Sequence, residues 1–237
     1  MLRVETGKAR CKAESTTDAA EIECEQAGGP VAILSGKGCV RLSESRESAA
    51  QGPQEPPSIV EFCTGRYGCD PDTLVANALF ADGAAALVGR SATSGDEAWG
   101  MVAAGSNLMP DAEDSMTWRI GNHGFQMTLS PRVPDLIGAH LRPWLEAWLA
   151  SLGRRLEDLN SWAVHPGGPR VLTSVAKALG LSEATLATSA EILAECGNMS
   201  SLTVLFILQR LQQQGARLPC LALGFGPGLV AEAALLE

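Results

Sequence analysis

The sequence predicts a layered α/β fold from residue 59 to residue 237. Short runs of β-branched and other apolar residues, bounded by Gly and Pro, alternate there with longer amphipathic segments. Their order, strand-helix-strand-helix-helix-strand-strand, is typical of a domain whose helices cover the faces of a sheet. With 46% hydrophobic and 19% charged residues, the chain of 237 residues can bury a core of that size.

Residues 1–58 do not share this pattern. Phe, Trp and Tyr are absent from the first 57 residues, which end in a Pro-rich stretch at residues 52–57. Large aromatic side chains contribute heavily to buried area, so this segment has little to offset the entropy lost on ordering. We therefore expect a poorly ordered N-terminal region with one short strand, at residues 31–34.

Residues 59–116 carry short elements of mixed pattern. The apolar run that ends at Phe80 is followed by an Asp82-Gly83 turn, which predicts a strand immediately after it. The expected elements are strands at residues 59–63 and 84–88, the apolar stretch at residues 74–80, and a strand with loops over residues 91–116.

Residues 117–237 carry the strongest periodicity. Ile137, Leu141 and Leu145 recur on one helical face, which predicts a helix over residues 137–152 that Gly153 ends. Residues 200–213 are apolar on nearly all sides, so this helix is expected inside the domain. The other expected elements are strands at residues 125–129, 162–164, 220–224 and 229–236, and helices at residues 171–179 and 183–195.

Composition excludes several classes of function. A net charge of −9 without any Lys/Arg cluster argues against nucleic acid as a partner. No apolar run reaches the length of a membrane span, and the N-terminus has no apolar core of a secretory signal. The seven cysteines form no CxxC pair and are odd in number, which indicates reduced thiols in a cytoplasmic protein. We expect neither a metal site nor a cofactor.

The motif Val164-His165-Pro166-Gly167-Gly168-Pro169 places a histidine at the end of a short buried strand. The glycines allow a ligand to approach the backbone closely, and the turn directs the imidazole toward a cleft. A histidine packed in the core beside a tight turn is the alternative, and for a lone histidine it is the commoner one.

The motif Gly197-Asn198-Met199-Ser200-Ser201 places an asparagine between two helices. Backbone N–H groups at the start of the second helix favour negative charge. An ordinary Asn-Ser helix cap is the alternative. Taken together, the histidine and asparagine motifs favour a Cys-His-Asn site acting on a thioester.

Four segments in register resemble the type III polyketide synthases, the chalcone synthase-like family. They are the His165 motif, the Asn198 motif with its continuation to Leu208, Gly224-Phe225-Gly226-Pro227-Gly228-Leu229, and residues 78–84. The resemblance covers roughly residues 59–237. It implies a thiolase-like layered α/β/α fold made of two similar halves, usually in a homodimer. Residues 117–237 would be a complete C-terminal half, and residues 59–116 a remnant of an N-terminal half that is mostly missing.

The resemblance also implies a reaction. A cysteine accepts an acyl group from acyl-CoA, while His165 and Asn198 hold the thioester carbonyl of malonyl-CoA and stabilise the enolate formed on decarboxylation. Phe80 would be the gatekeeper between CoA tunnel and cavity. The remaining substrate-binding residues would be Cys63, Met127, Gly168, Gly226 and Pro227. Plain core packing remains the alternative for Phe80 and Met127.

Cys39 is the candidate nucleophile. Gly36-Lys37-Gly38-Cys39-Val40 resembles the nucleophile turn of bacterial members of the family. An apolar helix should begin at that cysteine, because the positive end of a helix lowers the pKa of a thiol. A charged segment at residues 41–47 stands there instead, as a shifted reading frame or a decayed gene would produce.

Three functions remain open from the sequence. The first is an active acyltransferase of the type III polyketide synthase kind. The second is a catalytically impaired or inactive remnant that packs on an intact homologue. The third is an enzyme similar to β-ketoacyl-ACP synthase III, which would need a basic patch for an acidic carrier protein that this acidic chain does not show.

Overall fold

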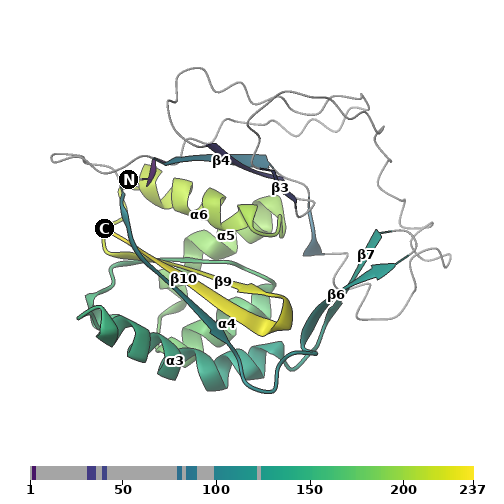
Figure 1. The fold of residues 1–237 in the computed structure, drawn as a ribbon. Helices are drawn as coiled ribbons and strands as arrows, with labels where there is room; N and C mark the ends of the chain where they lie inside the picture. The colour runs from purple at the N-terminus through teal and green to yellow at the C-terminus, as the bar shows by residue number, and fades with distance from the viewer. Residues whose placement is uncertain are drawn as a thin grey trace.

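The computed structural model describes residues 99–121 and 124–237, together with the short segments 2–3, 31–35, 39–41, 79–81 and 84–89. Strands and helices alternate in layers (Figure 1). The first layer is a four-stranded sheet in the order β1-β4-β2-β3, in which all described pairs are antiparallel. Its strands are β1 (Leu2–Arg3), β2 (Val31–Ser35), β3 (Cys39–Arg41) and β4 (Ala84–Gly89).

A second four-stranded sheet, in the order β5-β10-β9-β8, carries most of the core. The pairs β5·β10 and β10·β9 are antiparallel, whereas β8 pairs with β9 in parallel, with Val164 opposite Leu223. Parallel pairing of consecutive strands requires a long crossover, and three helices of the chain supply it. The strands are β5 (Met101–Leu108), β8 (Ser161–Val164), β9 (Cys220–Gly226) and β10 (Val230–Leu236).

Helices α3 (Val133–Ser151) and α4 (Pro169–Leu179) cover one face of this second sheet. The predicted apolar face of α3 is buried, since Ile137, Leu141 and Leu145 are fully enclosed. Gly153 adopts a φ of +69° just beyond the helix, and its N–H bonds back to Ala150, which confirms its predicted role in ending α3.

Helices α5 (Ala187–Cys196) and α6 (Leu202–Gln213) cover the other face. Figure 1 shows α6 between the two sheets. Its buried residues include Leu202, Ile207 and Leu208, and Ala85 of β4 belongs to the same apolar cluster. The prediction of a helix enclosed inside the domain is therefore confirmed, and its physical basis is that α6 contacts a sheet on two sides.

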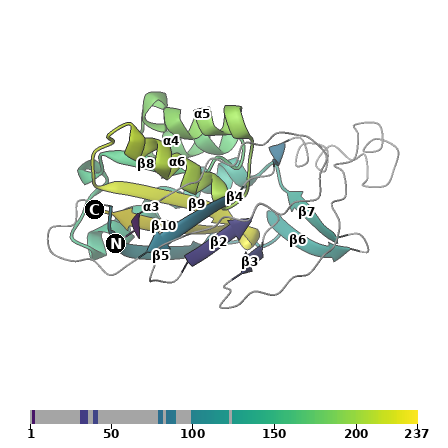
Figure 2. The ribbon, with the colours of Figure 1, turned by 90° about the horizontal axis from the view of Figure 1, so that it is seen from above.

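The strands β6 (Met116–Gly121) and β7 (Gly124–Leu129) form a separate antiparallel hairpin at one end of the molecule (Figures 1 and 2). The sequence predicted β7 but not β6, because residues 116–121 mix Thr, Trp, Arg and Gly without a clear alternation. Pairing with β7 stabilises β6 as a strand. Short 3-10 turns complete the chain as η1 (Leu156–Asp158), η2 (Glu183–Leu186) and η3 (Pro227–Leu229).

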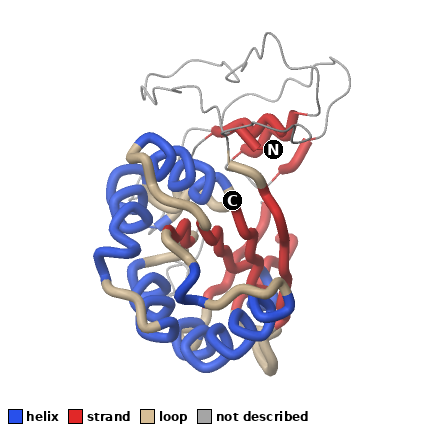
Figure 3. Tube along the Cα trace, turned by 90° about the vertical axis from the view of Figure 1, so that its left-hand side faces the viewer, coloured by secondary structure: helices blue, strands red, loops and turns tan. Residues whose placement is uncertain are grey.

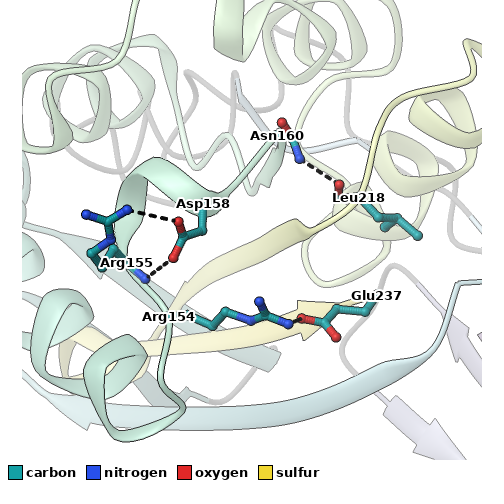
Figure 4. A network of polar contacts seen from close by, with 6 residues as sticks. All are labelled: Arg154, Arg155, Asp158, Asn160, Leu218 and Glu237. Carbon is teal, nitrogen blue, oxygen red and sulfur yellow. Dashed lines mark hydrogen bonds and ion pairs between the residues drawn. The ribbon is translucent and has the colours of Figure 1, made fainter.

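A polar network holds the loop that leads from α3 into β8 (Figure 4). Arg154 forms an ion pair of 2.6 Å with Glu237, and the backbone N–H of Arg155 donates to Asp158 at 2.8 Å. The side-chain amide of Asn160 donates to the carbonyl of Leu218 at 2.6 Å. These contacts attach the start of β9 and the end of β10, which lie at the same end of the second sheet, to one loop, and so fix where β8 begins.

The predicted elements that fall on described residues are confirmed, with ends shifted by a few residues. The expected helix at residues 183–195 is divided into η2 and α5. The expected strand at residues 59–63 lies outside the described residues. Seen from the side, the helices group around the strands (Figure 3), as expected for a layered α/β fold. Among the described helices, none is long and apolar enough to cross a membrane.

Candidate active site

His165 follows β8 directly and continues its parallel ladder. Its backbone N–H donates to the carbonyl of Leu223 at 2.7 Å, and its own carbonyl accepts the N–H of Gly167 at 3.1 Å. The chain then turns into α4, where Gly168 is the N-cap and Pro169 the first helical residue. Proline suits that position because its missing N–H has no partner in a helix. The turn therefore fixes the backbone of His165 on both sides.

The imidazole of His165 is held in an apolar setting. Its Nδ1 atom is buried and has no hydrogen-bond partner among the described residues. Burial lowers the pKa of His165 to about 4, so the ring is neutral near pH 7. Because Nδ1 is enclosed, the Nε2 edge is the part of the ring able to bond a ligand, and a neutral ring protonated there is a hydrogen-bond donor.

Asn198 is 3% exposed and follows α5 after one glycine. Its Oδ1 accepts the backbone N–H of Ser200 at 2.9 Å, which orients the amide. Its Nδ2 then faces the histidine turn and makes a long contact of 3.4 Å with the carbonyl of Gly167. An amide nitrogen carries two hydrogens, so one remains for a ligand.

Residues 79–81 run beside Asn198 as a short parallel bridge. The N–H of Ala81 donates to the carbonyl of Asn198 at 2.9 Å, and the N–H of Asn198 donates to the carbonyl of Leu79 at 2.8 Å. Phe80 therefore lies opposite Asn198, although the two are far apart in sequence.

His165, Asn198 and Phe80 line one cavity of about 810 Å³. A volume of this size is typical of sites for drug-sized ligands. Of the residues predicted to bind substrate, Met127, Gly226 and Pro227 also line it. Gly168 does not appear in the described lining; it packs toward Leu79, and its neighbour Gly167 faces the cavity instead.

Several lining residues escaped the sequence reasoning. Trp118 lies directly opposite Met127 in the β6–β7 hairpin, and both face the cavity. Glu232 is the one charged residue of the described lining, and it accepts a hydrogen bond of 2.6 Å from Ser106. Pairing of residues across a hairpin could have identified Trp118 once β6 was recognised as a strand. No sequence signal pointed to Glu232.

The candidate nucleophile is only partly described. Cys39 is the first residue of β3 and lies opposite Ser35 of β2, but its side chain is outside the described residues, as is all of Cys63. In the described part of the chain, Cys196 and Cys220 are not joined in a disulfide. Burial raises the pKa of Cys220 to about 12, which excludes it as a thiolate nucleophile near neutral pH.

Comparison with known proteins finds relatives of this chain. Residues 100–237 match the family described as chalcone and stilbene synthases, C-terminal domain. The chain is 41% identical over 186 residues to 1,3,6,8-tetrahydroxynaphthalene synthase of Streptomyces peucetius, covering 75% of this chain and 49% of that protein. It is 31% identical over 188 residues to the alpha-pyrone synthesis polyketide synthase-like Pks18 of Mycobacterium tuberculosis, covering 75% and 48%.

A solved structure shows the fold. The crystal structure of PKS-I from the brown alga Ectocarpus siliculosus superimposes with a TM-score of 0.66 at 31% identity, covering 71% of this chain and 48% of that one. The chain thus spans about half the length of the curated relatives it matches. The expected thiolase-like α/β fold is confirmed, and the chain belongs to the chalcone and stilbene synthase family, with residues 100–237 forming its C-terminal domain.

Proposed function

We propose that this chain acts as an acyltransferase that decarboxylates malonyl-CoA and condenses the product with a cysteine-bound acyl group. The observation that carries the proposal is the pair His165 and Asn198, which line one cavity of about 810 Å³. Asn198 Nδ2 keeps one hydrogen beyond its long contact with Gly167, and the enclosed Nδ1 of His165 leaves the Nε2 edge of that ring to bond a ligand. Membership in the chalcone and stilbene synthase family supports the same chemistry.

The two donors would bind the thioester carbonyl oxygen of malonyl-CoA. Loss of CO₂ leaves the electron pair of the broken carbon–carbon bond on the α-carbon, and the carbonyl oxygen takes up the negative charge as an enolate. Donors that are already oriented stabilise this charge without reorganising, and removal of one such donor typically costs about 10² to 10³ in rate. Burial keeps the ring of His165 neutral, which suits a donor rather than a general acid.

The condensation would follow from the enolate. Its α-carbon attacks the carbonyl of the acyl-cysteine, a carbon–carbon bond forms, and the carbon–sulfur bond breaks to release the cysteine thiolate. Cys39 is the proposed nucleophile. A free thiol has a pKa of about 8.5, so Cys39 needs a positive neighbour to be a thiolate near neutral pH.

The proposed partners follow from this reaction. Acyl-CoA and malonyl-CoA would be the substrates, and the chain would act as a cytoplasmic homodimer. Met101, Val102 and Leu108 of β5 are all more than half exposed, and an apolar strand of this kind is favourable to cover in an assembly. Light scattering coupled to gel filtration would report the mass, and a monomer at micromolar concentration would contradict the dimer.

Decarboxylation alone tests the described residues without requiring Cys39. Malonyl-CoA and a proton from water would give acetyl-CoA and CO₂, which chromatography quantifies. We expect His165→Ala and Asn198→Ala, which each remove a donor, to lower the rate by about 10² or more. His140→Ala, on α3 and outside the described cavity lining, is the matched control and should retain the wild-type rate. Equal rates in all four proteins would contradict the proposal.

Condensation tests the nucleophile separately. Purified protein with malonyl-CoA and a range of acyl-CoA starters should release CoA and form a pyrone or a resorcinol. Cys39→Ala should abolish this product while leaving decarboxylation intact. Product formation by Cys39→Ala at the wild-type rate would exclude Cys39 as nucleophile.

A catalytically impaired remnant is the second candidate, and the strand at Cys39 supports it. Residues 39–41 pair with β2 as β3, so no helix begins at Cys39 within this described segment. The activation that a helix N-terminus gives a thiol is then missing there. Decarboxylation without condensation, together with recovery of solubility or activity on co-expression with a full-length homologue, would favour this candidate.

A further inference from the structure

Ser189 is a buried hydroxyl that joins two elements of the site. It lies in the first turn of α5 and is fully enclosed, with 0% exposure. Its Oγ accepts the backbone N–H of Val164, the last residue of β8, at 3.2 Å. A buried serine in this position serves the backbone of another element rather than its own helix.

The backbone N–H of Val164 has few other hydrogen-bond acceptors within reach. Within the described sheet, β8 is the edge strand and has β9 on one side only. Successive N–H groups of a strand point to opposite edges, and the N–H of His165 already donates toward β9, to Leu223. The N–H of Val164 therefore points away from the sheet, into the buried contact with α5. Left without an acceptor, such a buried group destabilises the folded state.

Both elements lead directly to a site residue. The strand β8 ends at Val164 and His165 follows it, whereas α5 ends at Cys196 and is followed by Gly197 and Asn198. The Ser189–Val164 hydrogen bond therefore connects the strand that presents the histidine to the helix that leads to the asparagine. The described side-chain contact between the two motifs themselves, from Asn198 Nδ2 to the Gly167 carbonyl, is long at 3.4 Å.

The ring of His165 makes this connection important. Because Nδ1 has no partner among the described residues, the direction of the imidazole depends on its backbone and its packing. We propose that Ser189 is a positioning residue, which sets the separation of the His165 and Asn198 donors by holding α5 against the end of β8. This proposal rests on the proposed function of those two donors.

Loss of the hydroxyl should affect rate more than binding. The donors are needed most when charge develops on the carbonyl oxygen, so a displaced pair lowers kcat while KM for malonyl-CoA changes little. A misplacement of about 1 Å can cost roughly 10²-fold. We expect Ser189→Ala to lower kcat for decarboxylation at least tenfold.

The test uses four variants of the full chain. Ser189→Ala removes the acceptor, Ser189→Cys replaces it with a weak one of similar size, and Ser189→Thr retains the hydroxyl. Thr188→Ala is the matched control, since Thr188 is the preceding residue and bonds to the side chain of Gln214 at 3.2 Å instead of to β8. Ser189→Cys covers the case in which Ser189→Ala does not fold.

Two readouts separate this proposal from the proposed function. The first is kcat and KM for decarboxylation of malonyl-CoA. The second is the NMR chemical shift and pH titration of the His165 ring, assigned with His165→Gln among the three histidines. We expect Ser189→Ala and Ser189→Cys to change the His165 signals and Ser189→Thr to restore them. If Ser189→Ala and Ser189→Cys show the same His165 signals and the same kcat as Thr188→Ala, the proposal is overturned. The NMR readout remains decisive even if wild type does not decarboxylate malonyl-CoA.

Discussion

Phe80 and Asn198 lie opposite each other in a parallel bridge, joined by two backbone hydrogen bonds of 2.8 and 2.9 Å. The bonds run from Asn198 to Leu79 and from Ala81 to Asn198, so they enclose Phe80 on both sides. A displacement of either segment must move the other. The candidate gate of the cavity and one of its two donors therefore form a single backbone unit.

Gly197→Ala should disrupt this unit. Gly197 adopts a φ of +71°, and an added Cβ would lie 2.8 Å from the Cβ of Ala81. Gly215→Ala is the matched control, because Gly215 has a φ of +68° but no atom within 4 Å of an added Cβ. An alanine at either position carries backbone strain of about 1–3 kcal/mol from the positive φ, and the ψ of −172° at Gly197 makes that position the less tolerant of the two. We expect Gly197→Ala to lose more unfolding free energy in urea than Gly215→Ala. Only Gly197→Ala should decarboxylate malonyl-CoA at least tenfold more slowly than wild type. Equal stability and equal rates for the two variants would contradict the bridge.

Gly105→Ala should weaken the packing of β5 on α3. An added Cβ would lie 2.5 Å from Nε1 of Trp148, whose ring stacks with Trp144 at 6.3 Å between centroids. Overpacking of this kind costs about 1–3 kcal/mol. Gly138→Ala, on the same helix with open space around it, should instead stabilise by about 0.5–1 kcal/mol. A shift of the unfolding temperature in the same direction for both variants would contradict the packing of Gly105 against Trp148.

Thr203→Val should destabilise the start of α6. Thr203 is fully buried, and its Oγ1 accepts the N–H of Met199 at 2.9 Å. Valine keeps the shape but leaves that N–H without an acceptor, at a cost of about 1–3 kcal/mol. Because the affected turn also contains Asn198, we expect slower decarboxylation as well. Chemical denaturation and the malonyl-CoA assay measure the two effects, and a variant that is neutral in both would contradict the role of this hydrogen bond.

Stability should depend on pH through His165. Its pKa in the folded protein is about 4, below the ordinary value of about 6.5 expected in the unfolded chain. Between these values the unfolded chain binds more protons, so the unfolding free energy decreases as pH falls from about 6.5 to 4. His165→Gln removes this contribution. Urea unfolding at pH 7 and at pH 4.5 should show a smaller decrease for the variant, and an equal decrease would contradict the burial of the ring.

The described helices of the C-terminal half were predictable because their information is local. Ile137, Leu141 and Leu145 recur on one face of α3, and Gly153 ends it, so both the helix and its buried side followed from spacing. The same holds for α6, whose apolar surface on all sides indicated enclosure between layers. The identities of His165 and Asn198 as candidates also came from short motifs with glycine on at least one side.

Relationships between distant segments were not predictable from spacing. The pairing of β5 with β10 depends on long-range backbone hydrogen bonds, and β6 is a strand because β7 lies beside it. Trp118 enters the cavity only through that hairpin, opposite Met127. Nothing in the local pattern around Ser189 indicated that its hydroxyl bonds to β8.

The sequence by itself determined the order of most elements in residues 117–237, the enclosed helix and the two motifs that carry the family resemblance. These are properties of periodicity and of glycine and proline, which act over a few residues. Only the tertiary structure decided that His165 and Asn198 share a cavity, that the neighbours of Phe80 are hydrogen-bonded to Asn198, and that Ser189 links the histidine strand to the helix before Asn198. Such contacts depend on how separate elements pack, and a buried N–H finds its acceptor only once that packing has brought the two together.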